Sequence, residues 1–289
     1  MKQLWQCREA LAFCLVYAFS FALMGEVVKS VDPITSTLIT YGLTGLFFLL
    51  LNSKHFSDLW RSVLTYRNLL LIINVTTLAN TVLAFLVMTY VSPLVYVTVF
   101  FGSLPIMKDI TVFERYVLKT SAFWLNGAVL IGALTIAALT SASSNSETMK
   151  GLGLTLLSSY FAAMYMQKSA EFHKQSGLNS SQLLSLRFFL VIVVCGAYSL
   201  FQHDNASLNQ TDLIMLVGTA ISGSIIPLFL MQRSIVRLGV RRTVQWMPML
   251  PLMCMVILSA LGLELFTAWQ ILAVFVFSIL LFLQTRLKA

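Results

Sequence analysis

The chain has 289 residues, of which 58% are apolar and only 10% are charged. A soluble domain carries roughly 25% charged residues, so this composition excludes an ordinary soluble protein and predicts a membrane protein. The net charge of +8 does not indicate a nucleic-acid partner, because the basic residues fall in short connections between apolar segments. In a membrane protein such residues mark the cytoplasmic side.

Ten apolar segments follow one another along the chain, and each approaches the length of about 20 residues that a helix needs to cross a bilayer. They cover residues 9–28, 34–52, 68–90, 93–110, 121–140, 151–170, 180–201, 212–232, 243–262 and 267–285. Most of the 19 Lys and Arg residues fall in every second connection, starting before the first segment and ending after the last. The sequence therefore predicts an all-α integral membrane protein with ten transmembrane helices, in the cytoplasmic (inner) membrane with both termini cytoplasmic.

The link between the third and fourth segments is very short. Only the stretch Val91-Ser92-Pro93 connects them, so we expect these two segments to form a tight antiparallel pair. The outer surface of these segments would contact lipid and not water. We therefore expect polar side chains on them, such as Asn74 and Asn80, to point into the bundle.

A polar stretch at 141–150, SASSNSETMK, divides the ten segments into two sets of five. Because five is an odd number, the second set must enter the membrane from the opposite side. This predicts two inverted repeats, a design common in secondary transporters with a midplane site. Residues 1–142 would form the first repeat, 143–150 an extracytoplasmic linker and 151–289 the second repeat.

Charged residues in or beside the segments are candidates for coupling or gating, because a charge at membrane depth is costly. They are Glu26, Lys108, Asp109 and Arg187. The alternatives are positions in the interface for Glu26, with Lys29 as its partner, and for Lys108 and Asp109. Arg187 can instead extend to the headgroups from near its helix end. Coupling to protons would depend on Glu26, and the sequence leaves it open.

The sequence offers little for metal or catalytic chemistry. The four Cys residues make no CxxC and the three His residues lie in separate loops. An intramembrane enzyme needs paired acids, histidines or an activated nucleophile at depth, and no G-x-x-x-x-G-K-[ST] motif for ATP occurs. We therefore expect a protein that is not an enzyme, holds no cofactor and is not driven directly by ATP.

Three stretches carry a family pattern. The first is Val91-Ser92-Pro93 with Pro105 and Glu114-Arg115, the second is LLSLRF at 183–188, and the third is Leu238-Gly239 with Pro248, Pro251 and LGLE at 261–264. With these stretches the chain resembles the drug/metabolite transporter superfamily, EamA type, over nearly its whole length. It departs from the family at Tyr41, where the first repeat often has arginine. The resemblance implies a two-repeat bundle whose helices 1, 3, 4, 6, 8 and 9 line a central cavity, and transport of small organic solutes by alternating access.

On those helices, aromatic, amide and hydroxyl side chains are the candidates for substrate binding. They are Tyr17, Asn74, Asn80, Tyr96, Ser159, Tyr160, Tyr165, Ser222, Gln245 and Trp246. For each of them the alternative is an interhelical hydrogen bond without substrate contact. The mixture suits an uncharged or zwitterionic, partly apolar solute, so we expect a secondary transporter that exports an amino acid or a related small metabolite. The alternative is a carrier of sugar nucleotides or lipid-linked precursors, which needs deep cations that only Arg187 and Lys168 supply.

Overall fold

The computed structural model describes residues 2–112, 121–140, 146–201, 208–231, 233–234, 247 and 249–287, and in these ranges every regular element is helical. The elements are α1 (Lys2–Val27), α2 (Pro33–Leu51), η1 (Ser53–His55), α3 (Phe56–Thr65), α4 (Arg67–Val87), α5 (Pro93–Val112), α6 (Ser121–Thr140), α7 (Ser146–Ser176), α8 (Ser180–Arg187), α9 (Phe189–Phe201), α10 (Gln210–Thr219), η3 (Ala220–Ile225), α12 (Met249–Ala260) and α13 (Ala268–Leu287). A helix is present within each of the ten predicted segments. The expectation of an all-helical chain is thus confirmed for the residues described.

Five helical stretches in the described residues are long and apolar enough to cross a membrane. They are Pro33–Leu51, Arg67–Val87, Pro93–Thr111, Ser180–Phe201 and Gln210–Met231. Four further apolar helices are shorter: Leu11–Val27, Phe123–Ala138, Met249–Ala260 and Ala268–Leu283. Many large apolar side chains also face outward, including Phe189 (72% exposed) and Leu200 (82% exposed). An apolar outer surface of this extent is compatible with a lipid surrounding.

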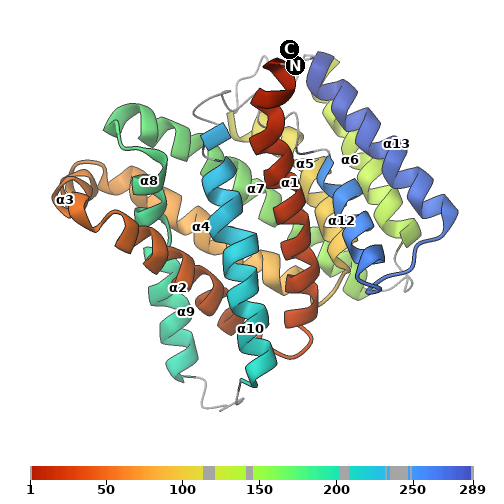
Figure 1. The fold of residues 1–289 in the computed structure, drawn as a ribbon. Coiled ribbons are helices and arrows are strands. Elements are labelled where there is room, and N and C mark those ends of the chain that lie inside the picture. The colour runs from red at the N-terminus through yellow and green to blue at the C-terminus, as the bar shows by residue number, and fades with distance from the viewer. Residues whose placement is uncertain are drawn as a thin grey trace.

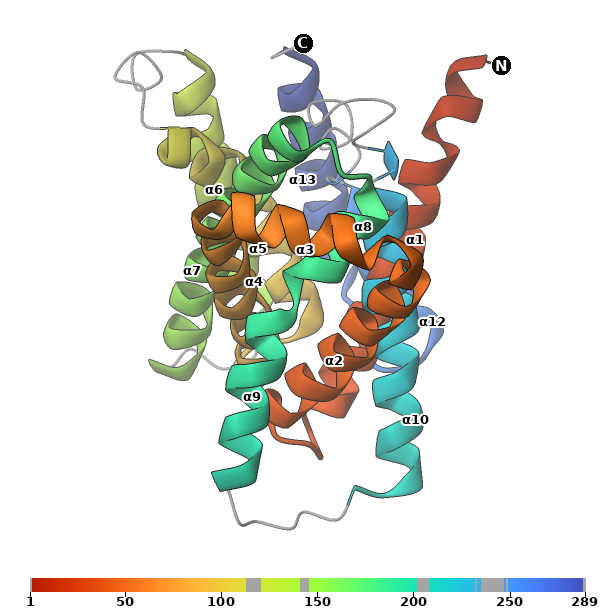
Figure 2. The same cartoon turned by 90° about the vertical axis from the view of Figure 1, so that its left-hand side faces the viewer.

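The first and last helices place the two ends of the chain on one side of the bundle. α1 begins and α13 ends at the same end, here called the terminal end, and α2, α7 and α10 begin at the opposite, far end (Figures 1 and 2). The core between these ends is built mainly from buried side chains of α1, α4, α5, α7 and α12.

A short amphipathic helix, α3, lies crosswise to the long helices near the terminal end (Figure 2). Leu59 faces inward with Leu70 and Phe172, while Phe56 and Trp60 are exposed. The sequence prediction treated this stretch as a loop and missed it, although its apolar residues recur at helical spacing.

The prediction that the third and fourth segments form a tight antiparallel pair is wrong. α4 and α5 both pack chiefly against α7 rather than against each other. α4 already ends at Val87, so the link is longer than expected, and the start of α7 packs against it at Gly151. A Cβ atom at Gly151 would stand 2.7 Å from a Val91 methyl carbon and 2.9 Å from the Tyr90 Cβ. The absence of a side chain there lets α7 lie between the two helices.

Candidate functional site

The predicted helix 180–201 is broken in its middle, at Phe188. This residue has φ −102° and ψ 4°, outside the helical range, and separates α8 from α9. Asn74 of α4 occupies the break. Its Nδ2 donates to the Leu186 carbonyl (2.9 Å), and its Oδ1 accepts from the Leu190 amide (3.1 Å). In an unbroken helix those two backbone groups would bond to each other, so the Asn74 amide is inserted into the helix hydrogen-bond ladder.

Arg187, the last residue of α8, lies at this break and its side chain is directed into the bundle. The side chain is buried (4% exposed), and its Nε donates to the Thr77 hydroxyl of α4 (3.1 Å). The guanidinium carbon lies 3.6 Å above the centre of the Tyr165 ring, in the range of a cation–π contact. The Nη1 atom has no hydrogen-bond partner, and none of the ion pairs between described residues includes Arg187.

A row of polar side chains connects α4, α7 and α5 beside this arginine. The Ser158 hydroxyl donates to the Asn80 side-chain oxygen (3.0 Å) and lies 3.5 Å from the Tyr96 hydroxyl. About two turns along α5 from Tyr96, Ser103 donates to the Ser159 hydroxyl (2.7 Å). These groups are mostly buried, so polar side chains bond to one another across three helices where water has little access.

Aromatic side chains of α1 and α5 cover the other side of this row. The Tyr17 ring packs against Phe21 (4.5 Å between ring centres) and edge-on to Phe101 (6.5 Å), and Phe21 packs against Tyr96 (5.6 Å). Tyr17 thus belongs to an aromatic cluster that joins α1 to α5.

A second irregular helix follows α10 directly. It is η3, in which Ala220–Ile225 form a π-helical turn. Such turns are frequent at functional sites. Gly223 in this turn touches α1, where a Cβ atom would stand 2.8 Å from the Ser20 Cβ. Ser222 bonds to the Gly218 carbonyl of its own helix (2.7 Å), and Ser224 is buried in the turn.

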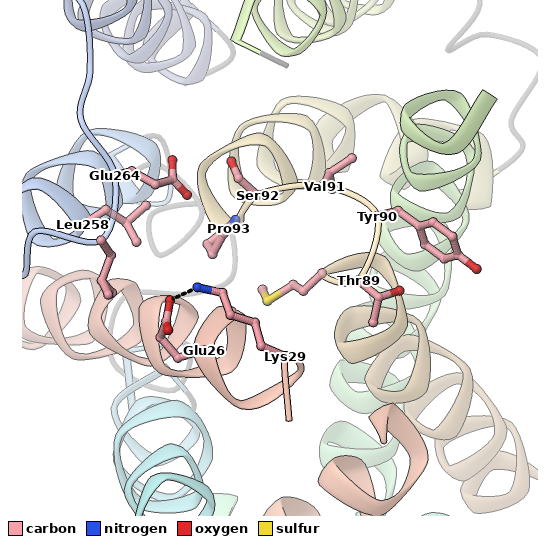
Figure 3. A pocket seen from close by; sticks show the side chains of 12 residues that line it. Glu26, Lys29, Thr89, Tyr90, Val91, Ser92, Pro93, Leu258 and Glu264 are labelled. Carbon is pink, nitrogen blue, oxygen red and sulfur yellow. Dashed lines mark hydrogen bonds and ion pairs between the residues drawn. The ribbon is translucent and has the colours of Figure 1, made fainter. Parts of the chain in front are cut away.

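A pocket of about 300 Å³ opens at the far end of the bundle, between the end of α1, the link that precedes α5 and the end of α12 (Figure 3). Glu26 lines it and forms an ion pair with Lys29 (2.5 Å). Glu264 faces it from the other side, beside Ser92. Burial raises the pKa of the Glu264 carboxyl, against the opposing effects of the Ser92 hydrogen bond and the Lys29 charge.

A second pocket, of about 380 Å³, lies between α5 and α7 toward the terminal end. Tyr160 and Lys168 line it, and Lys168 forms an ion pair with Glu171 (2.8 Å). At the end of α5, Lys108 is exposed and the Asp109 carboxylate accepts a hydrogen bond from the Asn126 amide of α6.

The predicted site residues therefore fall into separate groups. The first lies at or beside the broken helix: Asn74, Tyr165 and Arg187, with the row and cluster formed by Asn80, Tyr96, Ser159 and Tyr17 next to it. Glu26 lies in the far-end pocket, Tyr160 in the second pocket, Ser222 in the π-helical turn, and Lys108 and Asp109 at the end of α5. Gln245 and Trp246 lie outside the described residues.

Sequence reasoning missed Thr77 and Ser158. Hydroxyl groups inside helices most often bond to a carbonyl of their own helix, so their sequence positions give no signal. Tyr41 carried a signal, since it departs from the family pattern, but no role was predicted for it.

Comparison with known proteins gives a match for the fold alone. No family model and no curated protein matches the chain. A protein of known crystal structure shares its fold, with a TM-score of 0.69 over 98% of this chain and 96% of the other, at 12% sequence identity. The similarity extends from end to end, and at this identity it is evidence of a shared fold alone.

Proposed function

We propose that the protein is a secondary transporter that moves a small metabolite, such as an amino acid or related compound, across the cytoplasmic membrane by alternating access. The observation that carries this function is the broken α8–α9 helix, with Asn74 in the break and the buried Arg187 beside it. Broken helices that present backbone and charged groups to a midplane site recur in secondary transporters. A buried charge inside an apolar helical bundle is costly and is retained for function.

The packing of the helices supports two inverted five-helix repeats, of the type found in drug/metabolite transporters. In such a plan α1 corresponds to α7, α4 to α10, and α5 to α12. α7 packs against α4 and α5, and α1 packs in the same way against α10 and α12. The remaining correspondences pair α2 with α8–α9 and α6 with α13, and each of these helices packs against its own counterpart. This contact is expected for elements that lie beside the two-fold axis relating the two repeats.

The distribution of charge supports cytoplasmic termini. At the terminal end, the described residues include basic groups in the η1–α3 region and at the end of α7, such as Lys54, Arg61 and Lys174. The far end carries acids such as Glu26, Asp32 and Glu264. The positive-inside rule then assigns the terminal end to the cytoplasm, and ten crossings return the chain to the side on which it began.

Counterflow in proteoliposomes tests this function. Purified protein is reconstituted into vesicles loaded with pooled amino acids and small metabolites, and entry of the same labelled compounds is followed without any ion gradient. We expect exchange of at least one compound, absent from protein-free vesicles and unchanged in Thr135→Val, a substitution on the exposed face of α6. Exchange of no compound would contradict the proposed function.

A further inference from the structure

We propose that Arg187 is the binding site for a carboxylate group of the substrate, and that the substrate is a small monocarboxylate with an apolar or aromatic body. The assignment rests on the proposed transport function and names the chemical class transported. Three features of the described residues carry it: an unneutralised buried cation, an unused donor on that cation, and a neighbouring aromatic surface.

Arg187 is a cation without a counter-ion in the part of the chain that the structure describes. It is the only Lys or Arg among the described side chains that is buried, and no acidic side chain lies within ion-pair distance of it. Arginine remains charged at any physiological pH. A buried charge without a partner of opposite sign is strongly destabilising, and an anion that arrives with the substrate would remove this penalty.

The existing contacts of Arg187 leave one side of the guanidinium group unused. Nε is bound to Thr77, one face of the group lies on Tyr165 at 3.6 Å, and Phe188 lies 5.2 Å away. Nη1 is buried and has no hydrogen-bond partner. A carboxylate is a fitting occupant, because it accepts hydrogen bonds from guanidinium groups in a planar arrangement.

The Tyr41 ring stacks on the ring of Phe188, the residue next to Arg187 (5.4 Å between ring centres). Its phenol group can donate a hydrogen bond to an anion. Tyr17 belongs to the aromatic cluster of α1 and α5, which offers an apolar surface to the rest of the substrate. A phosphate dianion fits less well, since a single buried cation leaves half of its charge unneutralised.

Thermal stability of the purified protein in nanodiscs tests the assignment without a transport measurement. The probes are 3-phenylpropionate, 4-methylvalerate, L-phenylalanine and L-leucine, each compared with its primary amide, which keeps the shape and removes the anion. We expect at least one acid to raise the midpoint in a concentration-dependent manner, because a ligand that binds only the folded protein stabilises it. The matching amide should bind more than about ten-fold more weakly, as expected for a lost hydrogen bond to a charged group. No stabilisation by any acid, or equal stabilisation by acid and amide, would overturn the assignment.

Variants then assign the effect to Arg187. Arg187→Gln should abolish the difference between acid and amide, Arg187→Lys should retain part of it, and Tyr41→Phe should weaken acid binding while the guanidinium stays in place. Lys174→Gln, which removes an exposed cation of α7, is the control and should behave like the wild type. If Arg187→Gln does not fold, Arg187→Lys and Tyr41→Phe still test the site, and the comparison of acid with amide in the wild type still tests whether an anion is recognised.

The outcomes separate this assignment from the proposed function. Counterflow of an uncharged or cationic solute that survives Arg187→Gln would overturn the carboxylate site and leave transport intact. Binding of an acid by the wild type, together with no counterflow of any solute, would uphold the site and contradict transport.

Discussion

Replacement of Asn74 by leucine tests whether this amide holds the α8–α9 break open. The side chain makes three hydrogen bonds, to the Leu70 carbonyl (3.0 Å), the Leu186 carbonyl (2.9 Å) and the Leu190 amide (3.1 Å). Leucine has a similar size, so the substitution removes the polar contacts with little change of volume.

The expected loss of stability follows from those contacts. In membrane proteins a side-chain hydrogen bond contributes about 0.6 kcal/mol on average, so three give roughly 2 kcal/mol. Two of the partners, on Leu186 and Leu190, are backbone groups, and each costs about 1–3 kcal/mol if it stays buried and unpaired. We therefore expect Asn74→Leu to lower the free energy of unfolding by about 2–6 kcal/mol. The lower value applies if the break partly closes and the two backbone groups bond to each other.

Titration with SDS in mixed micelles, followed by circular dichroism, measures this difference. The matched control is Thr76→Val on the same helix, where the hydroxyl bonds only to the Ile72 and Ile73 carbonyls of α4, and the expected change is below about 1 kcal/mol. Closure of the break would also move Arg187, so counterflow should fall in Asn74→Leu even where the protein remains folded. Wild-type stability together with wild-type transport would refute the role assigned to Asn74.

Three further predictions concern packing and charge. Gly151→Ala should destabilise the protein by about 1–3 kcal/mol, because its Cβ would press on Val91 at 2.7 Å; Gly153→Ala on the same helix meets nothing within 4 Å and should be neutral or stabilising in the same SDS titration. Glu264 has a pKa raised above 4.5 by burial, so the folded state binds this proton more tightly than the unfolded state. Its contribution to stability should be complete below pH 4.5 and disappear as the pH rises through the raised pKa, and Glu264→Gln should flatten that part of a plot of melting temperature against pH. Glu26→Gln breaks an ion pair in which Lys29 is exposed and Glu26 is half-buried, and it should change stability by less than about 1 kcal/mol, measured by thermal melting. A larger loss would contradict the view that this is a weak surface pair.

The positions of the long helices could be predicted from the sequence because each is marked by a continuous apolar run. In lipid, such a run satisfies its backbone hydrogen bonds by forming a helix. The break at Phe188 could not be predicted in this way. Residues 180–201 contain no proline, and their glycine, Gly196, lies away from the break. The side chain that binds both backbone groups at the break is Asn74, which lies far away in the sequence and reaches α8 and α9 only in the folded protein.

The candidate site shows the same division between local and tertiary causes. Asn74, Asn80 and Arg187 could be selected from the sequence, since amides and charges in apolar segments must find partners. Which partners they find depends on packing. The position of α7 between α4 and α5 brings Ser158 to Asn80, and the short link between those two helices had suggested direct contact instead.

The two pockets lie toward opposite ends of the bundle, and α5 reaches both of them. Pro93, its first residue, lines the far-end pocket, and Thr111, close to its last, lines the pocket toward the terminal end. Under alternating access the two ends of the bundle must open in turn. A rigid α5 that lines both pockets would hinder this, because one end could not move without the other. Pro105 lies inside α5 between them, where a proline removes one backbone hydrogen bond and weakens the helix against bending. The half that bears Ser103 is bound to α7 at Ser159, so bending at Pro105 can move the terminal half of α5 while the other half stays packed on α7.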